Sequence, residues 1–169
     1  MESVVKTVCF TGHRNLTNIE NIEINLKETI KNAINNGYYN FLTGGALGFD
    51  ELAANTIISL KNEYPQMKLI LVLPFLNPYE HEKGWQEMDI EKYNILLEKA
   101  DEKVILNDEY KRGCYYQRDR YLVDNSSLCI SYQTRKKGGT AYTVDYANKQ
   151  GLQVINLAKW RKEKWQKNW

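Results

Sequence analysis

An unbroken apolar run from Lys68 to Phe75, KLILVLPF, constrains the fold of this chain more than any other part of its sequence. A strand with one face in water alternates apolar and polar residues, whereas a parallel strand covered by helices on both sides is apolar almost throughout. The run shows no alternation. We therefore expect a parallel sheet with helices on both of its faces.

Strand-like and helix-like segments alternate along the rest of the chain. Between the strands, apolar residues recur at helical spacing, as in the stripe Phe49, Leu52, Ala53, Thr56, Ile57 and Leu60. Right-handed crossovers then predict an α/β fold, a doubly wound, mostly parallel Rossmann-like sheet of about six strands. The expected strands are 4–10, 40–43, 68–75, 102–106, 128–132 and 153–158, and helices are expected within 19–34, 49–60, 86–99, 115–124 and 141–149.

The size and charge of the chain indicate one domain with a basic tail. With 169 residues, 43% hydrophobic content and 26% charged content, the chain can bury one sizeable core. We expect a single domain over residues 1–158 and a basic, tryptophan-rich tail over residues 159–169. The tail is interpreted either as a helix whose tryptophans pack back onto the domain or as a contact for an acidic partner.

Several classes of protein are disfavoured by composition. From Lys159 onward, five basic residues stand against Glu163, so the rest of the chain is nearly neutral and is a poor match for a wide nucleic-acid footprint. There is neither a long apolar window nor an N-terminal signal, so we expect a cytoplasmic protein without a membrane segment. Three cysteines without CxxC spacing and only two histidines indicate reduced thiols and no metal site.

Three glycine-rich or polar turns follow expected strands and precede expected helices: Thr11–Arg14, Gly44–Asp50 and Gly138–Thr140. The carboxyl ends of parallel strands meet at one edge of the sheet, where open α/β sheets bind ligands. Helix N-termini present free N–H groups, and glycine allows a phosphate to approach the backbone closely. We expect a small-ligand crevice there, although neither GxGxxG nor GxxxxGK[ST] is present.

Individual side chains at this edge have two interpretations each. Arg14 is either a surface cation or a partner for a phosphate. Asp50, in the first turn of its helix, either complements the helix dipole or accepts a hydrogen bond from a sugar hydroxyl. Trp85 either packs in the core or stacks on a base.

Five motifs together resemble the YpsA family of the SLOG superfamily: CFTGHR, TGGALGFDELAA, LPF with a downstream tryptophan, QRDRYLVDNSSLCISY and KKGGTAYTVDYA. The similarity covers about Val5 to Leu157. It implies a Rossmann-like domain related to DprA and LOG proteins, a nucleotide-related ligand across the three turns, and a homo-oligomer. The expected ligand-binding residues are Thr11, Gly12, His13, Arg14, Gly44, Gly45, Gly48, Asp50, Trp85, Arg118, Gly138, Gly139 and Thr140.

Similarity to LOG enzymes suggests a reaction but leaves it open. These enzymes hydrolyse nucleoside monophosphates with an arginine, which Arg118 matches, and a glutamate, in whose place Thr143 stands here. Asp145 follows about 200° further around the helix and is expected to face away. Glycosidic cleavage normally needs a carboxylate. If the protein is an enzyme, Arg118, Asp50 and Glu51 are the catalytic candidates.

We therefore expect a protein that binds a nucleotide or a nucleotide-derived, ADP-ribose-like ligand and acts as a sensor, regulator or sequestering module. No other cofactor and no metal are expected. A LOG-like phosphoribohydrolase is the alternative. A DprA-like binder of single-stranded nucleic acid comes third, because the nearly neutral body offers little to a polyanion despite tyrosines and arginines within 112–121.

Overall fold

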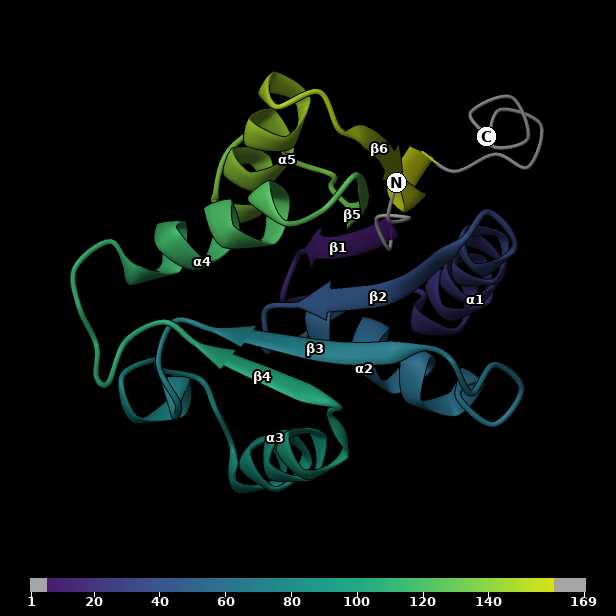
Figure 1. Ribbon diagram of the computed structural model, residues 1–169. Coiled ribbons are helices and arrows are strands. Elements are labelled where there is room, and N and C mark those ends of the chain that lie inside the picture. Colours follow the sequence, from purple (N-terminus) through teal and green to yellow (C-terminus); the bar gives the residue numbers. More distant parts are fainter. Residues whose placement is uncertain (1–5, 160–169) are drawn as a thin grey trace, which may run out of the picture.

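The alternation of strands and helices predicted from the sequence is present in the computed structural model, which describes residues 6–159 (Figure 1). The strands are β1 (Lys6–Gly12), β2 (Tyr38–Thr43), β3 (Lys68–Leu73), β4 (Glu102–Ile105), β5 (Leu128–Tyr132) and β6 (Gln153–Asn156). The helices are α1 (Ile19–Asn35), α2 (Phe49–Leu60), α3 (Glu87–Lys99), α4 (Cys114–Asp124) and α5 (Gly139–Lys149), with short 3-10 turns η1 (Pro78–Glu80) and η2 (Leu157–Lys159).

All six strands are parallel and lie in the order β4-β3-β2-β1-β5-β6. The chain starts in the middle of the sheet, moves outward to β4, and returns to place β5 beside β1. Val8 pairs with Leu128 at one end of this contact and Gly12 pairs with Tyr132 at the other. The order of the strands reverses between β1 and β5, which is where a doubly wound sheet opens a crevice at its carboxyl edge.

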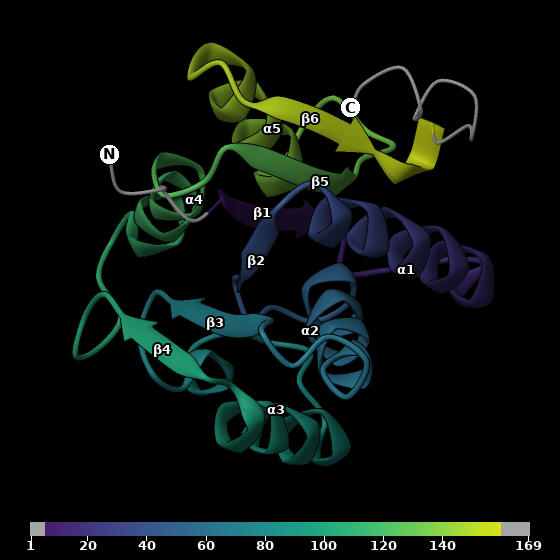
Figure 2. The same ribbon diagram turned by 45° about the vertical axis from the view of Figure 1, so that its right-hand side comes forward.

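Helices cover both faces of the sheet (Figure 2). The larger core lies between the sheet and α1, α2 and α3, and the smaller one lies beneath α4 and α5. β3 contributes Leu71 to the first core and Val72 to the second, which explains why its sequence lacks alternation. Cys9 and Cys129 are buried neighbours on β1 and β5, with free thiols.

The bounds of the elements differ little from the expected ones. β2 begins two residues earlier than expected because Tyr38 already pairs with Lys6. The last strand is shorter than predicted, since β6 ends at Asn156 and the chain continues into η2. The predicted tail falls outside the described residues apart from Lys159. Among the helices of residues 6–159, none combines the length and apolarity needed to cross a bilayer.

Candidate functional site

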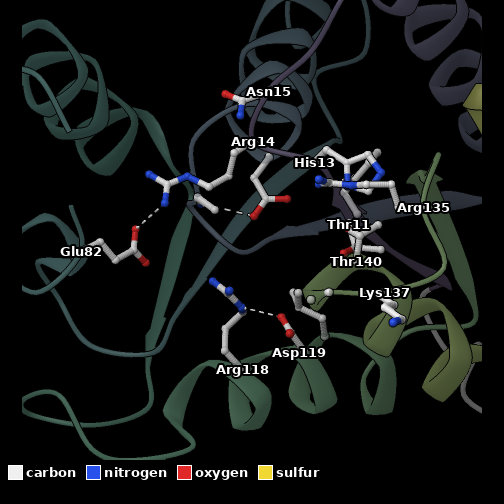
Figure 3. A pocket seen from close by; sticks show the side chains of 17 residues that line it. Thr11, His13, Arg14, Asn15, Glu82, Arg118, Asp119, Arg135, Lys137 and Thr140 are labelled. Atoms are coloured by element: carbon white, nitrogen blue, oxygen red, sulfur yellow. Dashed lines mark hydrogen bonds and ion pairs between the residues drawn. The ribbon is translucent and has the colours of Figure 1, made fainter. Parts of the chain in front are cut away.

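A cavity of about 350 Å³ lies at the carboxyl ends of β1 and β5 (Figure 3). Its walls come from the β1–α1 loop, the start of α2 with the loop before it, α4, and the β5–α5 loop. The predicted first and third turns therefore meet across one hollow. The residues that line it are Phe10, Thr11, Gly12, His13, Arg14, Asn15, Ala46, Asp50, Glu82, Arg118, Asp119, Leu122, Arg135, Lys137, Gly138, Gly139 and Thr140.

The N-terminus of α5 forms one end of this cavity. Gly138 precedes the helix with φ +103°, and no side chain caps the first turn. A Cβ on Gly138 or Gly139 would meet no atom within 4 Å, so the backbone is open to an incoming group. Lys137 stands beside these glycines and forms no ion pair with any carboxylate of residues 6–159. Free N–H groups, the helix dipole and a lysine together favour an anion.

His13 positions the loop that leads to α5. Its Nε2 accepts a hydrogen bond from the Thr134 backbone N–H at 2.8 Å, so the ring proton of the neutral imidazole belongs on Nδ1. Nη2 of Arg135 lies 3.4 Å from that nitrogen. Burial and the Arg135 charge lower the pKa of His13, which keeps the ring neutral at pH 7. His13 Nδ1 and Arg135 Nη2 are then both donors, so they form no hydrogen bond with each other. The Arg135 guanidinium therefore remains available to an anion.

A buried cluster of one arginine and two aspartates forms the opposite wall. Arg118 donates from Nε to Oδ1 of Asp119 at 2.8 Å and from Nη1 to the Gly44 carbonyl at 2.6 Å. Asp50 accepts a hydrogen bond from the Ala46 N–H at 3.2 Å. Asp50 and Asp119 are 7% and 8% exposed. The cluster therefore holds charge in a region from which water is largely removed.

The protonation of Asp50 is unusual. Burial raises the pKa of its carboxyl from 3.8 to about 6, against the opposing effect of the Arg118 guanidinium. Burial also disfavours the charge of Arg118, but the carboxylates of Asp119 and Asp50 outweigh it and raise the pKa of the guanidinium. Arg118 stays charged, while Asp50 can take up or release a proton near neutral pH. Such carboxyls are frequent at functional sites.

Arg14 and Glu82 close the cavity on the side of the β3–α3 loop. Nη1 of Arg14 lies 3.8 Å from Oε2 of Glu82, and the two side chains are 45% and 20% exposed (Figure 3). A pair this long and this exposed contributes little to stability. Arg14 can therefore leave Glu82 for a phosphate.

The glycines of the second turn do not line this cavity, although the sequence placed them among the ligand-binding residues; Gly48 lines a neighbouring cavity. A Cβ on Gly44 would lie 2.7 Å from Nη1 of Arg118, and one on Gly45 would lie 2.6 Å from Leu73. A Cβ on Gly48 would lie 2.2 Å from the Arg14 carbonyl oxygen. These glycines allow the loops and the arginine to approach each other. Of this turn, only Ala46 and Asp50 line the cavity.

Trp85 and Glu51 also lie outside this cavity. Trp85 packs at 5.6 Å from Tyr93 and 6.0 Å from Tyr79 between ring centroids, and its Nε1 donates to Glu82 at 2.8 Å. It is partly buried against the edge of the larger core, which agrees with its core-packing interpretation. Glu51 faces a neighbouring cavity.

Eight residues of the cavity were not among the expected ones: the apolar Phe10, Ala46 and Leu122, and the polar or charged Asn15, Glu82, Asp119, Arg135 and Lys137. The two cations stand just before Gly138, and Asp119 follows Arg118, so proximity in the sequence could have indicated these three. Glu82 carries no local signal, because only the path of the β3–α3 loop brings it to Arg14.

Comparison with known proteins shows the family of this chain. The model of the YpsA family, described as the YspA SLOG family, matches residues 9–157. The chain belongs to the YpsA family. Among its relatives, the UPF0398 protein YpsA of Bacillus subtilis is 31% identical over 131 residues, which are 73% of this chain and 71% of the relative.

Solved structures support the same fold for this YpsA-family chain. DNA processing protein A from Helicobacter pylori, described by its single-stranded DNA binding mode, superposes with a TM-score of 0.61 at 19% identity. The match covers 89% of this chain but only 64% of that protein, just under two thirds. The molybdenum cofactor carrier protein of Chlamydomonas reinhardtii superposes with a TM-score of 0.54 at 19% identity, over 89% of this chain and 75% of that one.

The position of the LOG glutamate holds a structural residue in this YpsA-family chain. Thr143 is buried, and its hydroxyl donates to the Gly139 carbonyl at 2.9 Å. Asp145 is exposed and does not line the cavity. The carboxylates that do line it are Asp50, Glu82 and Asp119.

Proposed function

We propose that this protein binds a nucleotide or a nucleotide-derived, ADP-ribose-like ligand in the cavity between β1 and β5, as a sensor, regulator or sequestering module. The observation that carries the proposal is the open N-terminus of α5 beside Lys137 and Arg135, facing the buried Asp50. The helix end and the cations suit a phosphate, and the carboxyl suits a sugar hydroxyl. Cytoplasmic location and assembly into a homo-oligomer belong to the same proposal.

The comparisons support a ligand of this chemistry. One structural neighbour is named for binding single-stranded DNA and another for carrying the molybdenum cofactor. Single-stranded DNA is a polymer with one phosphate per nucleotide, whereas the cavity of this chain has a volume of only about 350 Å³. That volume lies at the lower end of the range for small-molecule sites. We therefore favour a small nucleotide over a polymer.

Thermal unfolding with a panel of AMP, ADP-ribose, NAD, cyclic nucleotides and short oligonucleotides tests the proposal. A ligand present at about 100 times its dissociation constant adds roughly 2.7 kcal/mol to the stability of the folded state. We expect a clear rise in the unfolding midpoint with at least one intact nucleotide. A panel that leaves the midpoint unchanged at millimolar concentrations would contradict nucleotide binding.

Replacing Lys137 with alanine is expected to weaken nucleotide binding about tenfold, because a hydrogen bond to a charged group is lost. Isothermal titration calorimetry measures the change. Lys149→Ala is the matched control, since it removes the same charge from the last turn of α5, away from the cavity. Equal affinities for the two variants would exclude Lys137 from the phosphate site.

Asp50 favours a second candidate function, hydrolysis of the N-glycosidic bond of a nucleoside monophosphate. A carboxyl with a pKa of about 6, near the partly buried Arg118, can exchange a proton with a reacting group near neutral pH. Chromatography of AMP incubated with the protein would then show free adenine and ribose 5-phosphate, and Asp50→Asn would stop their release. If AMP stayed intact after prolonged incubation, hydrolysis would be contradicted and binding would be the only function proposed.

A further inference from the structure

A second cavity, of about 500 Å³, lies next to the first. It is bounded by the loop before α1, the first turns of α1 and α2, and Lys92 of α3. Arg14 and Asn15 line both cavities, so the two cavities adjoin at these residues. In Figure 3, Arg14 and Asn15 lie on one side of the first cavity and Lys137 lies on the other.

The first cavity is poorly suited to a nucleobase. Its side chains are mainly charged or hydroxylated, with four cations and three carboxylates. Its apolar side chains are Phe10, Ala46 and Leu122, and Phe10 and Leu122 are only 1% and 2% exposed, so they offer little surface to a ligand. A base needs apolar surface for its faces, and an aromatic side chain is the usual supplier. Trp85 packs against the edge of the larger core beside Tyr79 and Tyr93 and lines neither of these two cavities. The base of a bound nucleotide therefore needs another surface.

The second cavity offers that surface. Leu16, Ile19 and Leu52 provide apolar contact, and Ile19 is 51% exposed. The amides of Asn15 and Asn55 each present a donor and an acceptor, the combination with which asparagine binds the edge of adenine. Apart from Arg14, the single charges of Lys92 and Glu51 balance each other, so the cavity favours an uncharged group.

We propose that the second cavity holds the heterocyclic base of the nucleotide whose phosphate lies at the α5 N-terminus, with Ile19 and Leu52 against its face and Asn55 at its edge. Arg14, at the junction, contacts the sugar-phosphate part. This inference rests on the proposed function and assigns the base a place in it.

The test compares ligands with and without a base. We titrate AMP, ADP-ribose and ribose 5-phosphate into the wild-type protein and into an Ile19→Ala, Asn55→Ala double variant. Both side chains are exposed, so the variant is expected to fold, and its unfolding midpoint verifies this. The control is Ile24→Ala, which truncates another exposed isoleucine of α1, 63% exposed, outside the cavity.

We expect the double variant to bind AMP and ADP-ribose about tenfold more weakly, through lost apolar contact and a lost hydrogen bond. Ribose 5-phosphate should bind both proteins equally, and Ile24→Ala should bind every ligand as the wild type does. Unchanged AMP affinity in the double variant, or equal losses for AMP and ribose 5-phosphate, would overturn the base subsite but leave nucleotide binding intact. Failure of the wild-type protein to bind any of the three would overturn the proposed function itself.

Discussion

Gly48→Ala is expected to destabilise the folded protein by at least about 3 kcal/mol and to abolish nucleotide binding. Gly48 has φ +83°, and a Cβ there would lie 2.2 Å from the carbonyl oxygen of Arg14. Backbone atoms cannot rotate away as a side chain can, so the β1–α1 loop must shift. Arg14 and Asn15 move with that loop, and both line the two cavities. Chemical denaturation and nucleotide titration measure the two effects.

Gly151→Ala separates the clash from the cost of a positive φ. Gly151 has φ +80°, almost the same as Gly48, but a Cβ there would meet no atom within 4 Å. We expect a loss of about 1 kcal/mol and no effect on binding, because only the backbone conformation is disfavoured. Equal destabilisation by the two variants would mean that the contact between Gly48 and Arg14 does not hold the loop.

Asp50→Asn is expected to stabilise the protein at pH 7.5 by up to about 3 kcal/mol, the free energy that corresponds to a rise in pKa from 3.8 to about 6. The folded protein keeps the Asp50 proton up to about pH 6, whereas the unfolded chain releases it near pH 3.8. Stability of the wild type therefore falls as the pH rises through this window. The variant lacks this loss, and the difference in stability between the two proteins should disappear as the pH falls below 3.8.

Asp101→Asn provides a control of the opposite sign. Burial alone would raise the pKa of Asp101, but hydrogen bonds from Lys61 Nζ at 2.6 Å and the Leu69 N–H at 2.7 Å lower it. The charged form thus stabilises the folded state, and this contribution is lost as the pH falls below 3.8. Asp101→Asn should weaken the protein at pH 7.5, as urea denaturation can measure. A stabilised Asp101 variant, or an Asp50 variant no more stable than the wild type, would contradict these assignments.

Local patterns were sufficient to predict most of the fold. The apolar residues of KLILVL point alternately into two cores, so their continuous run correctly predicted cover on both sides of the sheet. In α2, the buried Phe49, Ala53 and Ile57 repeat at helical spacing. Because strands and helices alternate, the three glycine turns had to fall on one edge, and the structure places them there.

The same patterns could not decide which glycines face the cavity. Gly44 and Gly138 both follow a strand, yet a Cβ on Gly44 would touch Arg118 from α4 while one on Gly138 would meet open space. That difference depends on which distant element packs behind each turn. Glu82 illustrates the same limit, since long-range packing brings it to Arg14.

The most direct test of the account is a ¹H–¹⁵N NMR titration of the full-length protein with AMP, following the backbone amides. If the phosphate binds at the N-terminus of α5, the amide resonances of Gly138, Gly139 and Thr140 shift together and saturate at one dissociation constant. Those of the loop from Asn107 to Lys111, which lines a separate hollow, stay in place. Saturating shifts confined to that loop, or no shifts at millimolar AMP, would contradict the account.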